Sequence, residues 1–593
     1  MTTSMAAAYD EIVMQKLSGI PASPGIAVGR VHVHMEDQPP VPRYSVENDE
    51  IKGEIERFRQ AVIRAREELI RLRDRAETVQ AGSNGDFLDS HLLMLSDDDF
   101  LSRVESGVED RQRNAEWVLH EETQTVVRKL ASLDDQYLRE RSVDIHDVGR
   151  RILNHLMYRE RISLSDLTRE VVLVTHDLLP SDAIDMNKRM IRGIAMDAGG
   201  KTSHTAILAR AFEIPAVLGL GDFSSRVKNG SHIIVDGSRG LVVLEPDEET
   251  LRDYREQLSA YRKREVQLMS LNDLPAETRD GKLIHLKANI EIPEEVEAGF
   301  SHGADGVGLF RSEFLFLHAG RVPDEDSQYL AYRQVLEAMN SLPVTIRTLD
   351  VGGDKVIASL VNYPEKNPIL GWRAIRFCLS RTEIFRTQLR ALLRASIHGK
   401  LRIMFPMISG IEELNIALEF LDTVKREMKT AGEAFSDDIP VGIMIEVPSA
   451  AITSDILARR VDFFSIGTND LIQYTIAVDR GNERTTYLYE PFHPGILRLL
   501  TMTIDNAHNA GIPVGMCGEM AGDPLATMLL MGMGLDEFSM GAVSIPEVKR
   551  IIRSVTMGEA EELVGTVMEM RSYVDIDSYI KRLMQERFDV RVY

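Results

Sequence analysis

The sequence predicts a multidomain α/β protein, with an α/β domain interrupted by a helical insert, a connector helix and a C-terminal (β/α)8 barrel. Three observations support this. The 593 residues are too many for one ordinary domain. Eight strand candidates alternate with helices between residues 280 and 593. A strand, a two-glycine turn and a helix surround His204 nearer the N-terminus.

Composition narrows the class of protein further. The net charge of −23 disfavours a nucleic-acid partner. The two cysteines, Cys378 and Cys517, cannot form a disulfide framework, and no Cys/His spacing suggests zinc. No signal peptide and no apolar run of membrane-spanning length is visible. We therefore expect a cytoplasmic protein without membrane insertion.

The first α/β domain is expected to consist of two segments, residues 18–40 and 161–245, after an N-terminal extension at 1–17. Turns and short β segments fill the first segment. Val171–Thr175 and His232–Asp236 are strand-like runs in the second. The sequence alone does not establish that the two segments meet.

Residues 41–160 are expected to form the helical insert. Apolar residues recur there at steps of four and three, which is typical of an amphipathic helix: Ile51, Ile55, Phe58, Val62, Ala65, Leu69 and Leu72. Residues 86–110 contain eight acidic residues and one base, Arg103. This run is either a solvated face or a docking surface for a basic partner. Residues 246–275 predict a connector helix with Leu251, Tyr254, Leu258, Tyr261 and Met269 on one side.

His204 stands out because of its surroundings. Gly199 and Gly200 end a strand-like run, Thr202 and Ser203 occupy N-cap positions, and a helix is expected from Thr205. Unpaired N–H groups at a helix N-terminus favour phosphate, and an imidazole there could carry a phosphoryl group. A purely structural histidine is the alternative. A P-loop is a poor match, because Ala195 stands where that motif needs glycine.

Residues 276–593 are expected to form the barrel, with a doubly wound sheet as the alternative. The strand candidates are Leu283–Ile290, Gly306–Phe310, Val344–Leu349, Leu401–Met407, Val441–Val447, Asp462–Ile466, Val514–Cys517 and Glu537–Ser539. Barrel enzymes carry their chemistry at the carboxyl ends of the strands. The residues expected at or over that face are Arg311, Arg347, Arg373, Met407, Glu446, Asn469, Asp470, Arg480, Cys517 and Glu519.

These residue types indicate a specific chemistry. Several arginines suit a ligand that carries both phosphate and carboxylate. Glu446 and Asp470 could hold one Mg²⁺ together with substrate oxygens and water. Such a set neutralises a phosphoryl group in transfer. Cys517 is either a proton donor at a strand end or a small buried apolar residue.

Long motifs of the chain resemble Enzyme I of the bacterial sugar phosphotransferase system, the phosphoenolpyruvate–protein phosphotransferases. They are GGKTSHTAILAR (199–210), DGVGLFRSEFLF (305–316), RTLDVGGDK (347–355), NPILGWRAIR (367–376), RIMFPMI (402–408), SIGTNDLIQYTIAVDRGN (465–482) and GMCGEMAGD (515–523). The resemblance covers nearly the whole chain from Ser18.

The resemblance implies a role for each matched residue. His204 matches the phosphorylated histidine, and Cys517 the residue that protonates enolpyruvate. The residues that match phosphoenolpyruvate-binding positions are Arg311, Arg347, Arg373, Asn469, Asp470 and Arg480. Glu446 and Asp470 match the Mg²⁺ ligands. The resemblance also implies pyruvate as product, a swivelling domain around His204, docking of the phosphocarrier protein HPr on the helical insert, and a homodimer formed through the barrel.

Three other functions are less compatible with the sequence. Pyruvate phosphate dikinases and phosphoenolpyruvate synthases share the histidine domain and barrel, but carry an ATP-binding module for which the chain has no nucleotide loop. A scaffold protein that kept only the fold would be expected to have lost His204, Arg347 or Asp470, and all three are present. A barrel lyase would leave the first 270 residues unexplained.

Overall fold

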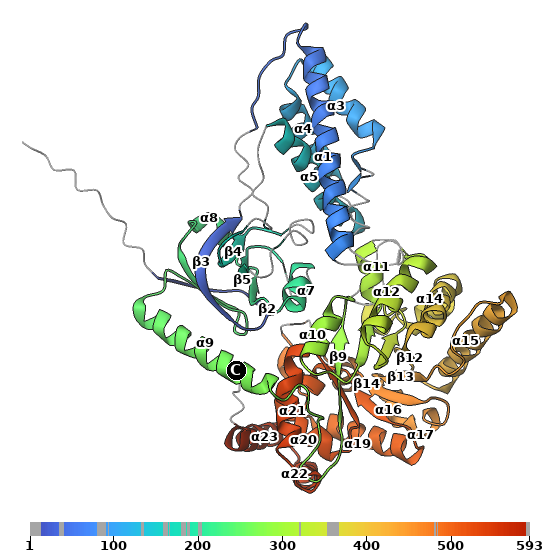
Figure 1. Ribbon diagram of the computed structural model, residues 1–593. Coiled ribbons are helices and arrows are strands. Elements are labelled where there is room, and N and C mark those ends of the chain that lie inside the picture. Colours follow the sequence, from blue (N-terminus) through green and yellow to red (C-terminus); the bar gives the residue numbers. More distant parts are fainter. Residues whose placement is uncertain are drawn as a thin grey trace, which may run out of the picture. The chain divides into compact units, whose positions relative to one another are not determined.

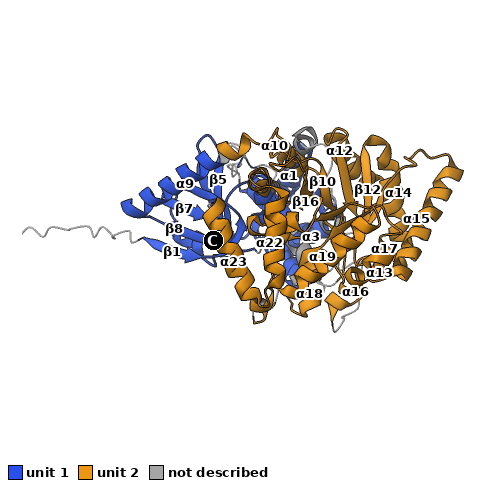
Figure 2. Ribbon diagram, turned by 90° about the horizontal axis from the view of Figure 1, so that it is seen from below, with its two compact units in different colours: residues 1–264 blue, residues 265–593 orange. Residues whose placement is uncertain are grey.

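The computed structural model divides the chain into two compact units, residues 1–264 and 265–593 (Figure 2). The residues that it describes are 14–34, 41–79, 91–92, 94–131, 136–157, 164, 167–178, 186, 190–199, 204–319, 322–352, 367–479, 482 and 484–588. No helix within these ranges is long and apolar enough to span a membrane.

Unit 1 contains an eight-stranded mixed sheet with the order β1-β8-β7-β3-β4-β5-β6-β2. The strands are β1 (Gln15–Ser18), β2 (Ile20–Ser23), β3 (Ile26–His34), β4 (Val171–Thr175), β5 (Ile191–Met196), β6 (Ala216–Leu218), β7 (His232–Asp236) and β8 (Leu241–Leu244). Strand β3 pairs in parallel with β4 and antiparallel with β7. The segments on either side of the helical insert therefore share one sheet.

The edge strand β1 starts at Gln15, inside the segment expected to precede the domain. Its four residues pair antiparallel with β8, from Gln15 opposite Leu244 to Ser18 opposite Leu241. The end of the N-terminal extension is thus a strand of the sheet.

The helical insert consists of α1 (Ile51–Val79), α3 (Asp98–Arg111), α4 (Ala115–Ala131) and α5 (Gln136–Leu156), drawn in blue to teal in Figure 1. The apolar stripe expected on α1 is buried, with Phe58 at 1% and Ala65 and Leu69 at 0% exposure. In the acidic run, Asp97 is the N-cap of α3 and accepts hydrogen bonds from the N–H groups of Asp99 and Phe100. Glu105 pairs with Arg59. Two of the run's carboxylates therefore have local structural roles.

Three further helices follow in unit 1: α7 (His204–Ala211), α8 (Phe223–Arg226) and α9 (Glu248–Met269), which continues across the boundary to unit 2. The start of α9 packs on the sheet, where Tyr254 is buried against Ile234 and Val243. Farther along the helix, Tyr261 is 46% and Met269 43% exposed.

Unit 2 is a closed barrel of eight parallel strands, which excludes the doubly wound sheet. The strands are β9 (His285–Ile290), β10 (Val307–Arg311), β11 (Pro343–Arg347), β12 (Lys400–Phe405), β13 (Val441–Ile445), β14 (Phe463–Ile466), β15 (Val514–Met516) and β16 (Glu537–Met540). The helices are α10 (Glu295–Ser301), α11 (Glu313–Ala319), α12 (Glu325–Ala338), α13 (Ile375–Ser380), α14 (Thr382–Ala395), α15 (Ile411–Ala431), α16 (Pro448–Ile452), α17 (Ser454–Leu457), α18 (Thr468–Ile476), α19 (Pro494–Asn509), α20 (Pro524–Gly532), α21 (Ile545–Arg553), α22 (Met557–Glu569) and α23 (Tyr573–Phe588). All eight strand predictions are confirmed.

Side chains fill the barrel interior in layers of different polarity. Near the amino ends of the strands, Glu537 binds both Lys287 and Arg402, at 2.7 and 3.0 Å. An apolar layer follows, formed by Leu309, Met404, Met444, Phe463 and Cys517. Charged residues return at the carboxyl ends. The barrel is therefore a packed core with its polar mouth at one end.

Candidate active site

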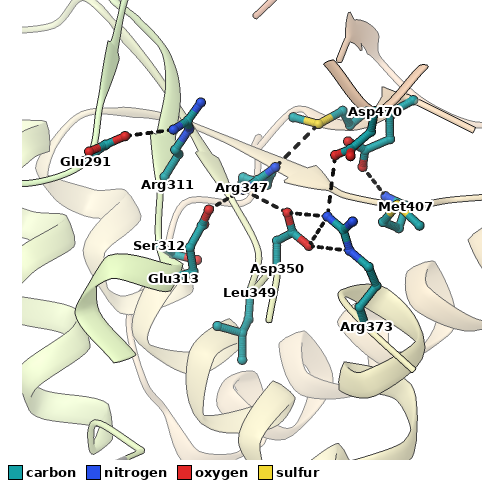
Figure 3. Close-up of polar contacts among 12 residues, drawn as sticks. Glu291, Arg311, Ser312, Glu313, Arg347, Leu349, Asp350, Arg373, Met407 and Asp470 are labelled. Atoms are coloured by element: carbon teal, nitrogen blue, oxygen red, sulfur yellow. Dashed lines mark hydrogen bonds and ion pairs between the residues drawn. The ribbon is translucent and has the colours of Figure 1, made fainter. Parts of the chain in front are cut away.

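Two arginines end neighbouring strands at the mouth of the barrel. Arg311 is the last residue of β10 and Arg347 the last of β11, and the register places them opposite each other. Arg347 donates a 2.5 Å hydrogen bond to Glu313 and pairs with Asp350 at 3.1 Å (Figure 3). Arg311 donates to Glu291 at 2.7 Å. Both guanidinium groups are thus held by carboxylates that follow the strand ends.

Arg373, in the loop between β11 and α13, is a third arginine at this mouth, and Arg311, Arg347 and Arg373 together form an arginine frame. It is 2% exposed. It donates to both oxygens of Asp350, at 3.1 and 3.2 Å, and to Asp470 at 3.5 Å. Asp350 therefore binds two arginines at once, and the sequence reasoning had no role for it.

The charges of the two buried arginines are stabilised by these partners. Burial alone opposes a charged guanidinium, but Glu313 and Asp350 raise the pKa of Arg347 above its usual value. Asp350 and Asp470 raise the pKa of Arg373 in the same way. Both side chains remain cationic and fixed, as a binding frame for an anion requires.

Glu446 lies in the same mouth, just beyond β13. It is 1% exposed, and its Oε1 accepts a 2.6 Å hydrogen bond from the N–H of Met407. Met407 adopts a left-handed backbone conformation with φ 57°. Burial, reinforced by the charge of Asp470, raises the pKa of Glu446 to about 8. A cation bound by both carboxylates would stabilise their charged forms and so lower the pKa of Glu446 again.

The donor set fits magnesium bound with its substrate. No cluster of three or more His, Cys, Asp or Glu ligands occurs among the described residues. Glu446 and Asp470 are two oxygen donors, and the charge of Asp470 contributes to the raised pKa of Glu446. Mg²⁺ usually takes one or two protein carboxylates and completes its octahedron with substrate oxygens and water. The residues present therefore fit this ion.

Cys517 follows β15 and is 3% exposed. Its Sγ lies 3.8 Å from the carbonyl oxygen of Ile466, within the apolar layer of the barrel. Burial raises the pKa of the Cys517 thiol, although Ser465 and the charge of Arg347 oppose the change. The thiol therefore retains its proton at neutral pH. Both interpretations of this residue, packing and proton donation, are compatible with the position.

Asn469 joins the ends of β14 and β15. Its side chain donates to Glu519 at 3.1 Å, and its Oδ1 accepts the N–H of Glu519 at 2.9 Å. Nearby, the Tyr474 hydroxyl donates to the carbonyl of Ile369 at 2.7 Å and accepts from Arg373 at 3.3 Å. These contacts fix the loops on which the frame depends.

A buried amide below the mouth is a further connection that sequence reasoning missed. Gln388 on α14 donates to Ser312 at 3.0 Å, and its Oε1 accepts the N–H of Leu349 at 2.8 Å. It thereby ties the residue after Arg311 to the residue before Asp350. No local sequence signal marks such a residue, because its partners lie 39 or more positions away.

Two of the expected site residues can be placed only in part or not at all. Arg480 lies outside the described residues. His204 is the first residue of α7, as the sequence indicated, and Gly199 before it has φ 98°. That positive φ explains the glycine at this turn.

Comparison with known proteins identifies the class of enzyme. The family of phosphoenolpyruvate-utilising enzymes matches in three models: the N-terminal domain at residues 18–141, the mobile domain at 167–240 and the phosphoenolpyruvate-binding domain at 265–557. Fold and site together therefore define a phosphoenolpyruvate-utilising enzyme.

Relatives at the level of the whole chain are more specific. The phosphoenolpyruvate-protein phosphotransferase of Bacillus subtilis (strain 168) is 44% identical over 96% of this chain and 99% of its own. The enzyme of Geobacillus stearothermophilus is 42% identical over 95% of this chain and 98% of its own. The enzyme of Staphylococcus aureus (strain MSSA476) is also 42% identical, over 96% of this chain and 100% of its own. The chain belongs to the phosphoenolpyruvate-protein phosphotransferase family.

Proposed function

We propose that the protein transfers the phosphoryl group of phosphoenolpyruvate to its own His204 and from there to a histidine of the phosphocarrier HPr, releasing pyruvate. The observation that carries this proposal is the arginine frame at the barrel mouth. Arg347 and Arg373 are buried, charged and joined through Asp350. Family membership provides independent support.

The arginine frame binds the substrate. Guanidinium groups bind phosphate and carboxylate by paired hydrogen bonds, and phosphoenolpyruvate carries both groups. We assign its contacts to Arg311, Arg347 and Arg373, with Arg480 and Asn469 completing the set. The buried carboxylates hold Arg347 and Arg373 in place before substrate arrives, which lowers the entropic cost of orienting it.

We assign Mg²⁺ to Glu446 and Asp470. When bound, the ion offsets the negative charge of the phosphoryl oxygens in transfer. The protein's own contribution is to hold the two carboxylates in place. The Met407 N–H bonds Glu446, and Arg373 bonds Asp470.

The chemical step breaks the bond between phosphorus and the enol oxygen, and that oxygen keeps the electron pair. The His204 imidazole forms the new bond to phosphorus. The enolate carbon then takes a proton, and we assign the donor to Cys517 because its raised pKa keeps the thiol protonated. Solvent returns a proton to the sulfur.

The position of His204 suits a phosphoryl carrier. It begins α7, an eight-residue helix whose first N–H groups have no helical acceptor. These groups and the helix dipole stabilise negative charge at that end.

The proposal also assigns a role to each part of the chain. Residues 18–40 and 161–245 carry the phosphohistidine, residues 41–160 receive HPr, residues 246–275 connect, and residues 276–593 bind phosphoenolpyruvate and form a homodimer. Residues 1–17 precede these parts. We place the protein in the cytoplasm, where phosphoenolpyruvate is available.

The test is incubation with phosphoenolpyruvate labelled on phosphorus, with Mg²⁺ and without ATP. We expect an acid-labile, base-stable label on the protein, which is typical of phosphohistidine, and we expect none on His204→Ala. HPr added afterwards should remove the label from the wild-type protein. Label retained by a folded His204→Ala variant would refute the assignment of His204. Label that depends on ATP would favour the dikinase instead.

A further inference from the structure

Every arginine of the frame has a carboxylate partner, but the pairs differ in burial. Glu313 and Asp350, which hold Arg347, have side chains only 0% and 1% exposed. The Arg311–Glu291 pair is more open, with side chains 32% and 17% exposed. Among the described pairs in Figure 3 it is the one in which solvent reaches both partners. An incoming anion can therefore reach Arg311 without breaking a buried pair.

The backbone presents Glu291 to Arg311 in a defined way. Glu291 is the first residue after β9, in the turn that leads to α10. The carboxylate of Glu295 closes that turn by accepting the N–H groups of Glu291 and Ile292, at 2.5 and 3.3 Å. Asn289, the penultimate residue of β9, bonds the carbonyl of Cys517 at 3.0 Å. The Glu291 carboxylate thus starts from a fixed turn beside the mouth.

We propose that Glu291 is a resident counter-ion of Arg311 that competes with the substrate's phosphate and so lowers the affinity of the site for phosphoenolpyruvate. This inference rests on the proposed function, in which Arg311 binds the substrate. Arg311 meets Glu291 through one nitrogen at 2.7 Å, whereas a phosphate group can accept two parallel N–H bonds. The substrate therefore displaces Glu291, but each binding event must break the existing ion pair.

The same exchange assists release of product. Pyruvate lacks the phosphoryl group, so Arg311 loses its substrate partner once transfer is complete. Glu291, still held by its turn, pairs with Arg311 again. The guanidinium is then never left without a counter-charge in a site that is partly shielded from water.

The decisive variant is Glu291→Gln, which keeps the shape of the side chain and removes its charge. An ion pair of this exposure is worth up to about 1 kcal/mol, which converts to a KM about two- to five-fold lower for phosphoenolpyruvate. We expect an equal decrease in the dissociation constant of phosphoenolpyruvate. Calorimetry with Mg²⁺ measures this constant in a His204→Ala background, where the substrate is not consumed. Glu297→Gln is the matched control, because Glu297 is an exposed acid on α10.

Glu291→Asp provides a second arm, since it keeps the charge but shortens the reach toward Arg311. We expect an affinity between those of the wild type and Glu291→Gln. Weaker binding by Glu291→Gln would mean that Glu291 positions Arg311 for substrate, and unchanged binding would mean that the pair is incidental; either result overturns the proposal. If the wild-type protein takes no label from phosphoenolpyruvate, the proposed function is refuted instead. That result is obtained without any Glu291 variant, so the two failures can be told apart.

Discussion

Lys287 is a buried cation that the barrel should tolerate losing. Its side chain points into the lower layer of the barrel, where the residue is 2% exposed and its Nζ lies 2.7 Å from Glu537. Arg402 donates to both oxygens of the same carboxylate, at 3.0 Å each. Two cations therefore share one anion. Replacing Lys287 with methionine leaves a balanced pair of Arg402 and Glu537, so we expect the Lys287→Met barrel to be more stable.

The size of the effect follows from the pKa of this lysine. Burial, with the charge of Arg402 adding to it, lowers the pKa of Lys287 from 10.5 to about 8, although Glu537 opposes the change. One pKa unit corresponds to about 1.4 kcal/mol, so the charged form is disfavoured by about 3 kcal/mol. Methionine avoids this cost but loses the contact with Glu537. We expect a net gain of about 1–3 kcal/mol at pH 7.

The gain should depend on pH in a defined direction. The unfolded lysine titrates near 10.5 and the folded one near 8, so between these values the unfolded chain binds more protons. Native stability of the wild type therefore rises with pH across this window. The advantage of Lys287→Met should be constant below pH 8 and shrink between pH 8 and 10.5.

Urea unfolding followed by tryptophan fluorescence measures the difference. The chain has two tryptophans. Removing Trp117 of the helical insert as Trp117→Phe leaves Trp372 of unit 2 to report on the barrel. Lys282→Met, at an exposed position shortly before β9, controls for loss of a lysine charge. A lower unfolding midpoint for Lys287→Met with an unchanged Lys282→Met would refute the reasoning, because it would make Lys287 a required counter-charge of Glu537.

Two further predictions concern the mouth of the barrel. Cys517→Ala should lower kcat roughly 100-fold while the dissociation constant of phosphoenolpyruvate in the His204→Ala background stays unchanged, because proton donation acts after binding; an unchanged kcat would assign Cys517 to packing. Asp350→Asn should raise that dissociation constant and destabilise the barrel by about 3 kcal/mol, because two buried guanidinium groups lose their shared carboxylate. If Asp350→Asn unfolds in urea at the same midpoint as the wild type, Glu313 and Asp470 suffice to hold the arginine frame.

The barrel was predictable because its signals are local. Each strand is a short run of apolar, β-favouring residues between helices, and eight such units in sequence leave few alternatives to a closed parallel barrel. Strand ends then indicate where chemistry lies, since all carboxyl ends of a parallel barrel share one face. Arg311, Arg347 and Glu446 could therefore be placed at one mouth from the sequence.

The partners of those residues were not predictable in the same way. Asp350 binds two arginines, one of them 23 positions away, and Gln388 reaches Ser312 across 76 positions. Such contacts depend on side-chain conformations after the barrel has closed, and no periodicity in the sequence records them. The exposure of side chains along α9 depends on the fold in a related way. Periodic apolar residues predict a helix, but whether Tyr261 is covered depends on the neighbours that the fold supplies.

The balance of charge at the mouth supports a role for a divalent cation more strongly than the arginines alone suggest. The described mouth contains three arginines against six acidic side chains, which are Glu291, Glu313, Asp350, Glu446, Asp470 and Glu519. An anionic substrate is not attracted to such a surplus of negative charge. Burial raises the pKa of Glu446 to about 8, and the charges of Asp470 and Asp350 add to this effect. A cation at Glu446 and Asp470 would reverse it, and displacement of Glu291 would free Arg311 for phosphate. Binding of phosphoenolpyruvate should therefore require Mg²⁺ in the wild type and depend on it less in Glu291→Gln.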